Sequence, residues 1–254
     1  MRESIFAIFM ILGMASLCCA QNVSTSKYQY EMVRLDSSLD AKANPKLVKF
    51  VDKKKSKLDK NMNVVIGRTD MAMVNFKPAS PLSNFLTDLL LENGPQKVEP
   101  AAVCDFAMLN FGGIRAQLPE GNVTVGNIYA LSPFDNYLVL IDVKGSELRK
   151  ALMKFTDKFS APMAGIKMVY RNGRPVKILI GGEPLSDTKT YRMITLNFIA
   201  EGGDNLLRDV HYERVVNSNV IFRDFLLEEI QKMTREGKVI HCELDDRVVI
   251  EPVF

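Results

Sequence analysis

Histidine is scarce in this 254-residue sequence, and neither sign of charge is in large excess. Its two histidines, His211 and His241, lie far apart and in no metal-ligand spacing with Asp or Glu, so each is interpreted as a surface or hydrogen-bonded polar side chain. A nucleophile motif of the Gly-x-Ser-x-Gly type is missing as well. The sequence therefore shows no hydrolytic centre of its own.

The balance of charge argues against a nucleic-acid partner. Lys and Arg number 33, and Asp and Glu number 30, which is a formal net charge of +3. A face that binds phosphate backbones needs a larger excess of basic residues. Any anion that this chain binds should therefore be small and locally recognised.

The composition is that of a globular protein, with 47% hydrophobic and 25% charged residues. The length permits one large domain or two small ones. Strand-like and helix-like segments are mixed without strict alternation, and no low-complexity linker or repeat divides them. We therefore predict one α/β domain over residues 21–254.

The first twenty residues have the composition of a targeting segment and are treated apart from the predicted domain. Arg2 precedes an apolar run from Ile5 to Leu17 that is too short to span a bilayer comfortably, and small residues follow it. We predict a signal peptide over residues 1–20, cut ahead of Gln21, and export to the periplasm or cell surface. The alternative is lipid attachment at Cys18 or Cys19, which would bring the chain to a membrane, although the residues upstream fit a lipoprotein signal poorly.

Cleavage would leave two cysteines, Cys104 and Cys242. Cys104 lies in the nearly continuous apolar run 101–109 and is interpreted as a small buried core residue. An oxidising compartment would permit a disulfide between the two, but two cysteines far apart in the sequence do not specify one.

Alternating and continuous apolar patterns predict the strands. The run 101–109 indicates a strand buried on both faces of a sheet. Two apolar runs separated by Asn172-Gly173 predict a hairpin over 166–180, because Asn and Gly tolerate the positive φ of a tight turn. The other predicted strands are 28–35, 63–68, 137–143, 191–198 and 248–250.

Capping residues and helical spacing predict the helices. A helix opened by Ser80-Pro81 should end at Gly94, and another should run over 146–155 with Ser146 as its cap. The last long helix should be capped by Asn217 or Ser218. A further helix should begin at Pro45, with its lysines facing water and its apolar residues near one face, namely Leu47, Val48, Phe50, Val51 and Leu58.

Three polar or glycine-containing segments stand beside predicted strands: 110–115, 131–136 and 197–205. Glycines let the backbone come close to a ligand. The planar guanidinium of the arginine in the first segment can donate two hydrogen bonds, as a fork, to phosphate or carboxylate oxygens. Taken singly, paired glycines are often only a tight turn, and Phe134 or Phe198 could equally be a core residue.

Read together and in this order, the segments resemble the C-terminal domain of the 5'-nucleotidase family. That family shows an Asn-Gly-Gly-Gly-Ile-Arg segment, a Pro-Phe turn followed by a strand and a Gly-x-x-Leu helix, and a Phe-Leu-Ala-x-Gly-Gly-Asp-Gly segment. Here the middle part continues through 137–144 to Gly145 and Leu148. The resemblance runs from about Ser80 to the end of the chain. It implies a mixed α/β sandwich with layered sheets covered by helices.

The resemblance also implies roles for individual residues. Phe134 and Phe198 would sandwich a nucleobase, and Asp204 would accept hydrogen bonds from ribose hydroxyls. Asn110 and Arg115 would hold the phosphate. The backbone would approach that phosphate at the two glycines of the first segment, Gly112 and Gly113.

The sequence departs from the family pattern at three places. Phe111 stands where the family has a glycine of its first motif, and Asn205 stands where it has the last glycine of the third. An upstream family arginine is replaced by the stretch 76–78, in which Lys77 supplies a charge but not a planar fork. Phosphate recognition should therefore be altered.

In the family, hydrolysis belongs to an N-terminal metallophosphatase domain that holds two metal ions. We therefore expect no cofactor in this chain, with divalent metals only in a separate metallophosphatase partner. The chain would recognise a nucleoside monophosphate for an exported phosphomonoesterase and would be inactive alone. The alternatives are a stand-alone exported nucleoside- or nucleotide-binding protein, and a degenerate domain kept for protein interaction.

Overall fold

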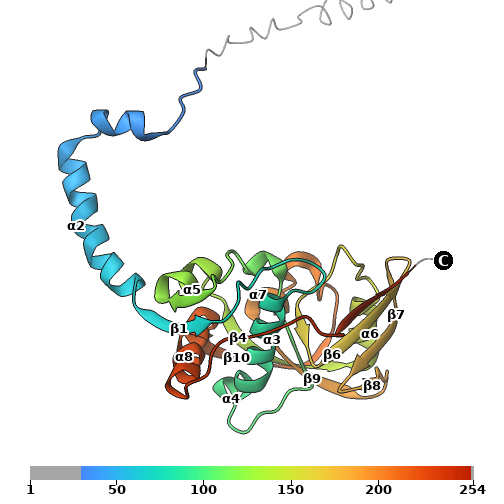
Figure 1. Cartoon of the computed structure of the whole chain (residues 1–254). Helices are drawn as coiled ribbons and strands as arrows, with labels where there is room; N and C mark the ends of the chain where they lie inside the picture. The colour runs from blue at the N-terminus through green and yellow to red at the C-terminus, as the bar shows by residue number, and fades with distance from the viewer. Residues whose placement is uncertain (1–29, 253–254) are drawn as a thin grey trace, which may run out of the picture. The chain divides into compact units, whose positions relative to one another are not determined.

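The computed structural model describes residues 30–252 and divides into two units, Met1–Phe50 and Val51–Phe254 (Figure 1). The predicted signal peptide, with Cys18 and Cys19, lies outside the described residues. The first unit contains the 3-10 helix η1 (Ser37–Lys42), capped by the Asp36 carboxylate, which accepts a hydrogen bond from the Ser38 amide at 3.0 Å.

The strand predicted at 28–35 does not form over its described part, 30–35. Tyr30 and Met32 are 86% and 90% exposed. Alternation alone does not make a strand, because a strand needs a neighbour to satisfy its backbone hydrogen bonds.

The helix expected at Pro45 is confirmed as α2 (Pro45–Met62), but none of its residues is buried. The apolar residues expected near one face of this helix are all exposed: Leu47, Val48, Phe50, Val51 and Leu58.

Five strands form the central sheet of the second unit, in the order β10-β4-β9-β2-β5. Strand β2 runs parallel to β9, whereas β4 is antiparallel to both β9 and β10, and β5 is antiparallel to β2. The bounds are β2 Phe106–Met108, β4 Tyr137–Lys144, β5 Met163–Ala164, β9 Thr190–Leu196 and β10 Tyr212–Ile221.

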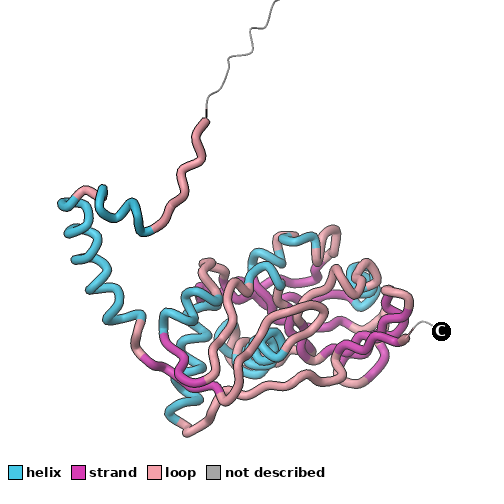
Figure 2. The backbone as a smooth tube through the Cα atoms, turned by 45° about the horizontal axis from the view of Figure 1, so that its top comes forward, coloured by secondary structure: helices cyan, strands magenta, loops and turns pink. Residues whose placement is uncertain are grey.

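Two smaller sheets accompany it. The last strand, β11, joins the edge of a four-stranded sheet in the order β11-β6-β7-β8, near the C-terminal end of the described chain (Figures 1 and 2). Its strands are β6 Ile166–Arg171, β7 Arg174–Ile180, β8 Glu183–Pro184 and β11 Val248–Glu251. The two-stranded sheet pairs β1 (Val65–Thr69) with β3 (Gly121–Thr124).

Helices cover the sheets as the predicted sandwich requires. Beyond η1 and α2, the helices are α3 Pro81–Asn93, α4 Pro95–Val98, η2 Phe111–Gly113, α5 Val125–Leu131, α6 Gly145–Leu152, α7 Asn197–Ala200, η3 Gly203–Asn205 and α8 Phe222–Arg235. Among the described residues, no helix combines the length and apolar character that crossing a membrane requires.

Both faces of the central sheet are buried along β4, β9 and β2, whereas the edge strand β10 is largely exposed. In β4, Leu138 and Leu140 join a hydrophobic cluster that also holds the buried faces of α3 and α8. The alternate residues Val139 and Ile141 join a second cluster, which includes α6 and the β6–β7 hairpin. Burial on two faces explains why β2 and the stretch Leu138–Ile141 of β4 are continuously apolar. The layered α/β fold class is thus confirmed.

Several local predictions are confirmed. Ser80 caps α3 in a capping box, in which its hydroxyl accepts from the Ser83 amide at 3.1 Å and the Ser83 hydroxyl accepts from the Ser80 amide at 2.9 Å. Gly94 is the C-cap of α3. The β6–β7 hairpin turns at Asn172 and Gly173, with φ of 53° and 70°.

The predicted strand 101–109 is shorter than expected. Only Phe106–Met108 forms β2, since Ala101 turns the chain with φ of 60° and Val103 is 76% exposed. Cys104 is half-buried against the core, and its thiol and that of Cys242 are both free, so the disulfide does not form.

Two predicted caps are wrong. Helix α6 begins at Gly145 after Lys144, and Ser146 instead donates its amide to the Asp187 carbonyl at 3.1 Å. Asn217 and Ser218 lie within β10, and α8 begins at Phe222. Pairing with β4 therefore outweighs the local capping preference of these two residues.

Candidate functional site

The three polar segments meet at the edge of the central sheet that is formed by strand ends, where β2 and β9 finish and β4 begins. Because β2 and β9 are parallel and β4 is antiparallel to β9, the carboxyl ends of β2 and β9 lie beside the amino end of β4. Asn110 follows β2, Phe198 follows β9, and Phe134 precedes β4. The strand order thus brings together segments that are distant in the sequence.

A cavity of about 300 Å³ lies at this edge. All seven residues that the family resemblance singled out line it, and Asn136 lines it with them. Asn136 was within the segment 131–136 but had no local pattern to set it apart. The lining residues are Asn110, Gly112, Gly113, Arg115, Phe134, Asn136, Phe198 and Asp204.

The two phenylalanines stay out of the hydrophobic core. Phe134 is 47% exposed and Phe198 is 39% exposed, and both line the cavity. Large apolar rings held at the surface of one concave site are suited to contact a flat ligand. The core interpretation, open for each of them on sequence grounds, is therefore wrong for both.

Asn110 and Asp204 are joined across the cavity floor. The Asn110 side-chain amide donates to the Asp204 carboxylate at 2.7 Å, and Asn110 is 5% exposed. Asp204 adopts a left-handed backbone, with φ of 52°, inside η3. Non-glycine residues rarely adopt this conformation, and it recurs where a side chain must be aimed.

At two glycines beside the cavity, Gly113 and Gly203, a side chain would clash with a neighbouring residue. A Cβ on Gly113 would lie 2.8 Å from the Asn110 amide oxygen, and one on Gly203 would lie 2.4 Å from the Phe198 ring. Both approaches are shorter than real Cβ contacts allow. The absence of a side chain at these two positions lets Asn110 and Phe198 lie close to the backbone.

The departures from the family pattern are accommodated locally. Phe111 lies in η2, where a side chain is sterically allowed, and the Lys77 ammonium lies 5.7 Å from the centroid of its ring. Asn205 has φ of 57°, a region that Asn tolerates better than most residues.

Arg115 is the one cationic side chain among the residues that line the cavity. Its guanidinium donates to the Gly112 carbonyl at 3.3 Å and is otherwise exposed. Lys77, which the sequence offered in place of an upstream arginine, is not a lining residue. Its ammonium donates instead to the Lys158 carbonyl at 3.3 Å.

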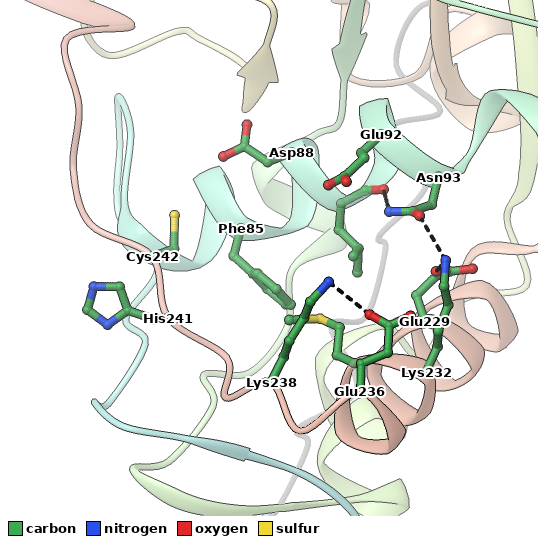
Figure 3. A pocket seen from close by; sticks show the side chains of 12 residues that line it. Phe85, Asp88, Glu92, Asn93, Glu229, Lys232, Glu236, Lys238, His241 and Cys242 are labelled. Carbon is green, nitrogen blue, oxygen red and sulfur yellow. Dashed lines mark hydrogen bonds and ion pairs between the residues drawn. The ribbon is translucent and has the colours of Figure 1, made fainter.

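A second cavity, of about 360 Å³, lies between α3 and α8 (Figure 3). Both of its lysines are paired with acidic side chains: Lys238 lies 2.8 Å from Glu236, and Lys232 lies 3.5 Å from the buried Glu229 (Figure 3). Groups already paired have less to offer a ligand than convergent free ones. The cavity at the strand edge is therefore the stronger candidate site.

The histidines stand apart from both the site and each other. The His241 ring nitrogen Nδ1 lies 2.9 Å from the Asp70 carboxylate, which raises the pKa of His241 above its ordinary value. The His211 amide faces Glu147 at 3.5 Å. Within residues 30–252 no group of three His, Cys, Asp or Glu side chains is arranged to hold a metal ion.

Comparisons with a family model and with known proteins agree on one family. Residues 61–209 match the family described as 5'-nucleotidase, C-terminal domain. Protein UshA of Yersinia enterocolitica is 32% identical over 193 residues, which cover 73% of this chain and 34% of that protein. The trifunctional nucleotide phosphoesterase YfkN of Bacillus subtilis is 29% identical over 72% of this chain and 14% of its own length.

A solved structure agrees in fold. The 5'-nucleotidase precursor of Thermus thermophilus superposes with a TM-score of 0.67 and 27% identity, covering 81% of this chain and 43% of that one. The chain thus spans only a minor part of the relatives that it matches. With the family match over 61–209 and the shared fold, the chain belongs to the 5'-nucleotidase C-terminal domain family.

Proposed function

We propose that this chain recognises nucleoside monophosphates on behalf of a 5'-nucleotidase-type phosphomonoester hydrolase. The observation that carries the proposal is the single cavity into which the two rings, one carboxylate and one guanidinium converge. Those groups match the parts of a nucleotide: a flat base, ribose hydroxyls and an anionic phosphate.

Each group has a definite part in recognition. Phe134 and Phe198 would stack on opposite faces of the base, at about 1–3 kcal/mol per stacked base. The Asp204 carboxylate, oriented by Asn110, would accept hydrogen bonds from ribose hydroxyls. Arg115 would meet the phosphate, with the backbone at Gly112 and Gly113 close by.

Hydrolysis would be carried out by a separate metallophosphatase chain, and both would act outside the cytoplasm after removal of residues 1–20. Two-metal phosphoester hydrolysis needs a set of metal ligands. The two histidines of this chain, far apart in the sequence, supply no such set. The metal ions would therefore be held by the partner.

Titration calorimetry with adenosine monophosphate tests the recognition step. Phe134→Ala and Phe198→Ala should each weaken binding by about 5- to 150-fold, the range that corresponds to the loss of one stacking contact. Phe159→Ala is the matched control, because Phe159 is 37% exposed and does not line the cavity. Equal effects of all three variants would contradict the assignment.

Phosphate release tests the division of labour. The purified chain should release none from adenosine monophosphate with added Mn²⁺ or Zn²⁺, and a co-expressed metallophosphatase should restore hydrolysis that depends on Phe134 and Phe198. Metal-dependent hydrolysis by the chain alone, surviving repeated purification, would overturn the proposal.

A second candidate is a stand-alone exported protein that captures nucleosides or nucleotides. The same cavity supports it, because two rings, a carboxylate and a guanidinium converged on one concave site are what a binding protein needs. Phosphate release separates the two candidates. Hydrolysis that a co-expressed metallophosphatase restores, and that depends on Phe134 and Phe198, would support the split enzyme, whereas nucleotide binding without any such restored hydrolysis would support capture.

A further inference from the structure

The Phe134 ring is held at the surface by a short turn, which itself needs support. Residues 132–136 connect α5 to β4 and form no regular element of their own. A ring that is 47% exposed gains little from packing, so its position depends on the backbone that carries it.

Arg223 donates hydrogen bonds to this turn on both sides of Phe134. Its Nη1 donates to the Pro133 carbonyl at 3.1 Å, and its Nη2 donates to the Asp135 carboxylate at 2.6 Å. The guanidinium carbon lies 4.6 Å from the centroid of the Tyr129 ring in α5. One planar group thus contacts the residues before and after Phe134 and the helix that leads to them.

The sheet explains how Arg223 reaches the turn. Strand β10 is antiparallel to β4, and Ile221 at its end pairs with Tyr137 at the start of β4. Helix α8 follows β10 directly, so its first turn stands at the edge where the cavity lies. The Phe222 amide also donates to the Asn136 carbonyl at 2.8 Å.

The same turn is tied to the segment that carries the second ring. The Tyr137 amide donates to the Asn197 side-chain oxygen at 2.9 Å. Asn197 begins α7 and immediately precedes Phe198. A displacement of the Phe134 turn would therefore also strain the link to the other wall of the cavity.

We propose that Arg223 is a positioning residue of the base-binding cavity, setting the Phe134 ring opposite Phe198 without touching the ligand itself. The inference rests on the proposed nucleotide function. The side chain of Arg223 is 11% exposed, and burying a cation is costly unless it is well paired. Both of its hydrogen-bond acceptors in the turn flank Phe134, and only a planar fork reaches the two together.

Arg223→Lys keeps the positive charge and removes the planar guanidinium that donates to both Pro133 and Asp135. Arg247→Lys is the matched control, because the Arg247 side chain is 13% exposed and pairs with Asp88 and Asp245 away from the cavity. In hydrogen-exchange mass spectrometry of the full chain, peptides covering 132–136 should exchange faster in Arg223→Lys and remain unchanged in Arg247→Lys.

Affinity for adenosine gives the second readout. Arg223→Lys should weaken binding about tenfold, as expected when hydrogen bonds to a charged group are lost. In a Phe134→Ala background, Arg223→Lys should cause little further loss, because a residue that acts through Phe134 has no effect once the ring is gone. Additive losses, or unchanged exchange over 132–136, would overturn the proposal.

The two proposals can fail separately. If the wild-type chain binds neither adenosine nor adenosine monophosphate, the proposed function fails, and exchange over 132–136 still decides whether Arg223 holds the turn. If Arg223→Lys does not fold, Asp135→Asn replaces it, since Asp135 is 66% exposed and loses only one bond of the fork. Asp135→Asn should speed exchange over 132–136, and no change there would count against the proposal.

Discussion

The Asn110 amide donates to the Asp204 carboxylate at 2.7 Å, although 94 positions of sequence separate the two residues. This contact joins the start of the first polar segment, 110–115, to the end of the third, 197–205. It also explains the two neighbouring glycines, because a side chain at Gly113 would press on Asn110 and one at Gly112 would come within 3.3 Å of Asp204.

Asp204→Asn should reduce affinity for adenosine about tenfold, because hydrogen bonds to a charged acceptor are stronger than those to a neutral one. The affinity for 2′,3′-dideoxyadenosine should hardly change, since it lacks the hydroxyls that Asp204 is proposed to bind. Calorimetry with the two ligands measures the difference. Asp209→Asn is the control, as Asp209 is exposed, has φ of 65° and does not line the cavity. Equal losses for the two ligands would argue against the ribose role.

Gly203→Ala should weaken nucleoside binding by displacing the Phe198 ring, because the added Cβ would lie 2.4 Å from the ring and 2.5 Å from the Phe198 carbonyl. Overpacking of this kind typically destabilises a fold by about 1–3 kcal/mol. Binding assays and thermal melts measure both effects. Gly237→Ala provides the comparison, because its φ of 71° makes Ala costly while a Cβ there meets nothing within 4 Å. That variant should lose stability but keep its affinity, and unchanged affinity in Gly203→Ala would contradict the steric argument.

The Cys104 thiol should resist alkylation in the folded protein. Burial raises its pKa to about 12, so at pH 8 only about one molecule in ten thousand carries the reactive thiolate. Cys242, with its pKa raised to about 11 by burial, should react somewhat faster. Peptide mapping after iodoacetamide treatment, with and without guanidinium chloride, measures both rates. Rapid labelling of Cys104 in the native protein would show that the segment 101–105 opens readily.

The contact between His241 and Asp70 should stabilise the fold at low pH, and this stabilisation should disappear as the pH rises. The hydrogen bond to Asp70 raises the His241 pKa in the folded state. A raised pKa contributes stability that is fully present below the unfolded value of about 6.5 and is lost as the pH rises through the folded value. Asp70→Asn should therefore lower the melting temperature slightly at pH 6 and leave it unchanged at pH 9. In a His241→Gln background the pH 6 effect should vanish, and an equal decrease at both pH values would exclude the pairing.

Local signals predicted the elements whose conformation depends on neighbours in sequence. Ser80 caps α3 because its hydroxyl reaches an amide three residues on, and the hairpin turns at Asn172-Gly173 because both residues accept positive φ. Where long-range pairing competed, local signals failed. Asn217 and Ser218 have the chemistry of helix caps, yet they lie in β10, which pairs with β4 from Tyr212 to Ile221.

By itself, the sequence determined the composition of the candidate site: the residues at the ends of the strands include two rings, a carboxylate, an amide and a guanidinium, and the glycines beside them leave room. Only the tertiary structure decided that these groups share one cavity, that Asn136 joins them, and that Arg223 supports the turn that carries Phe134. The reason is that strand order is set by burying both faces of β4 and β9, a property of the whole domain that no short stretch of sequence contains.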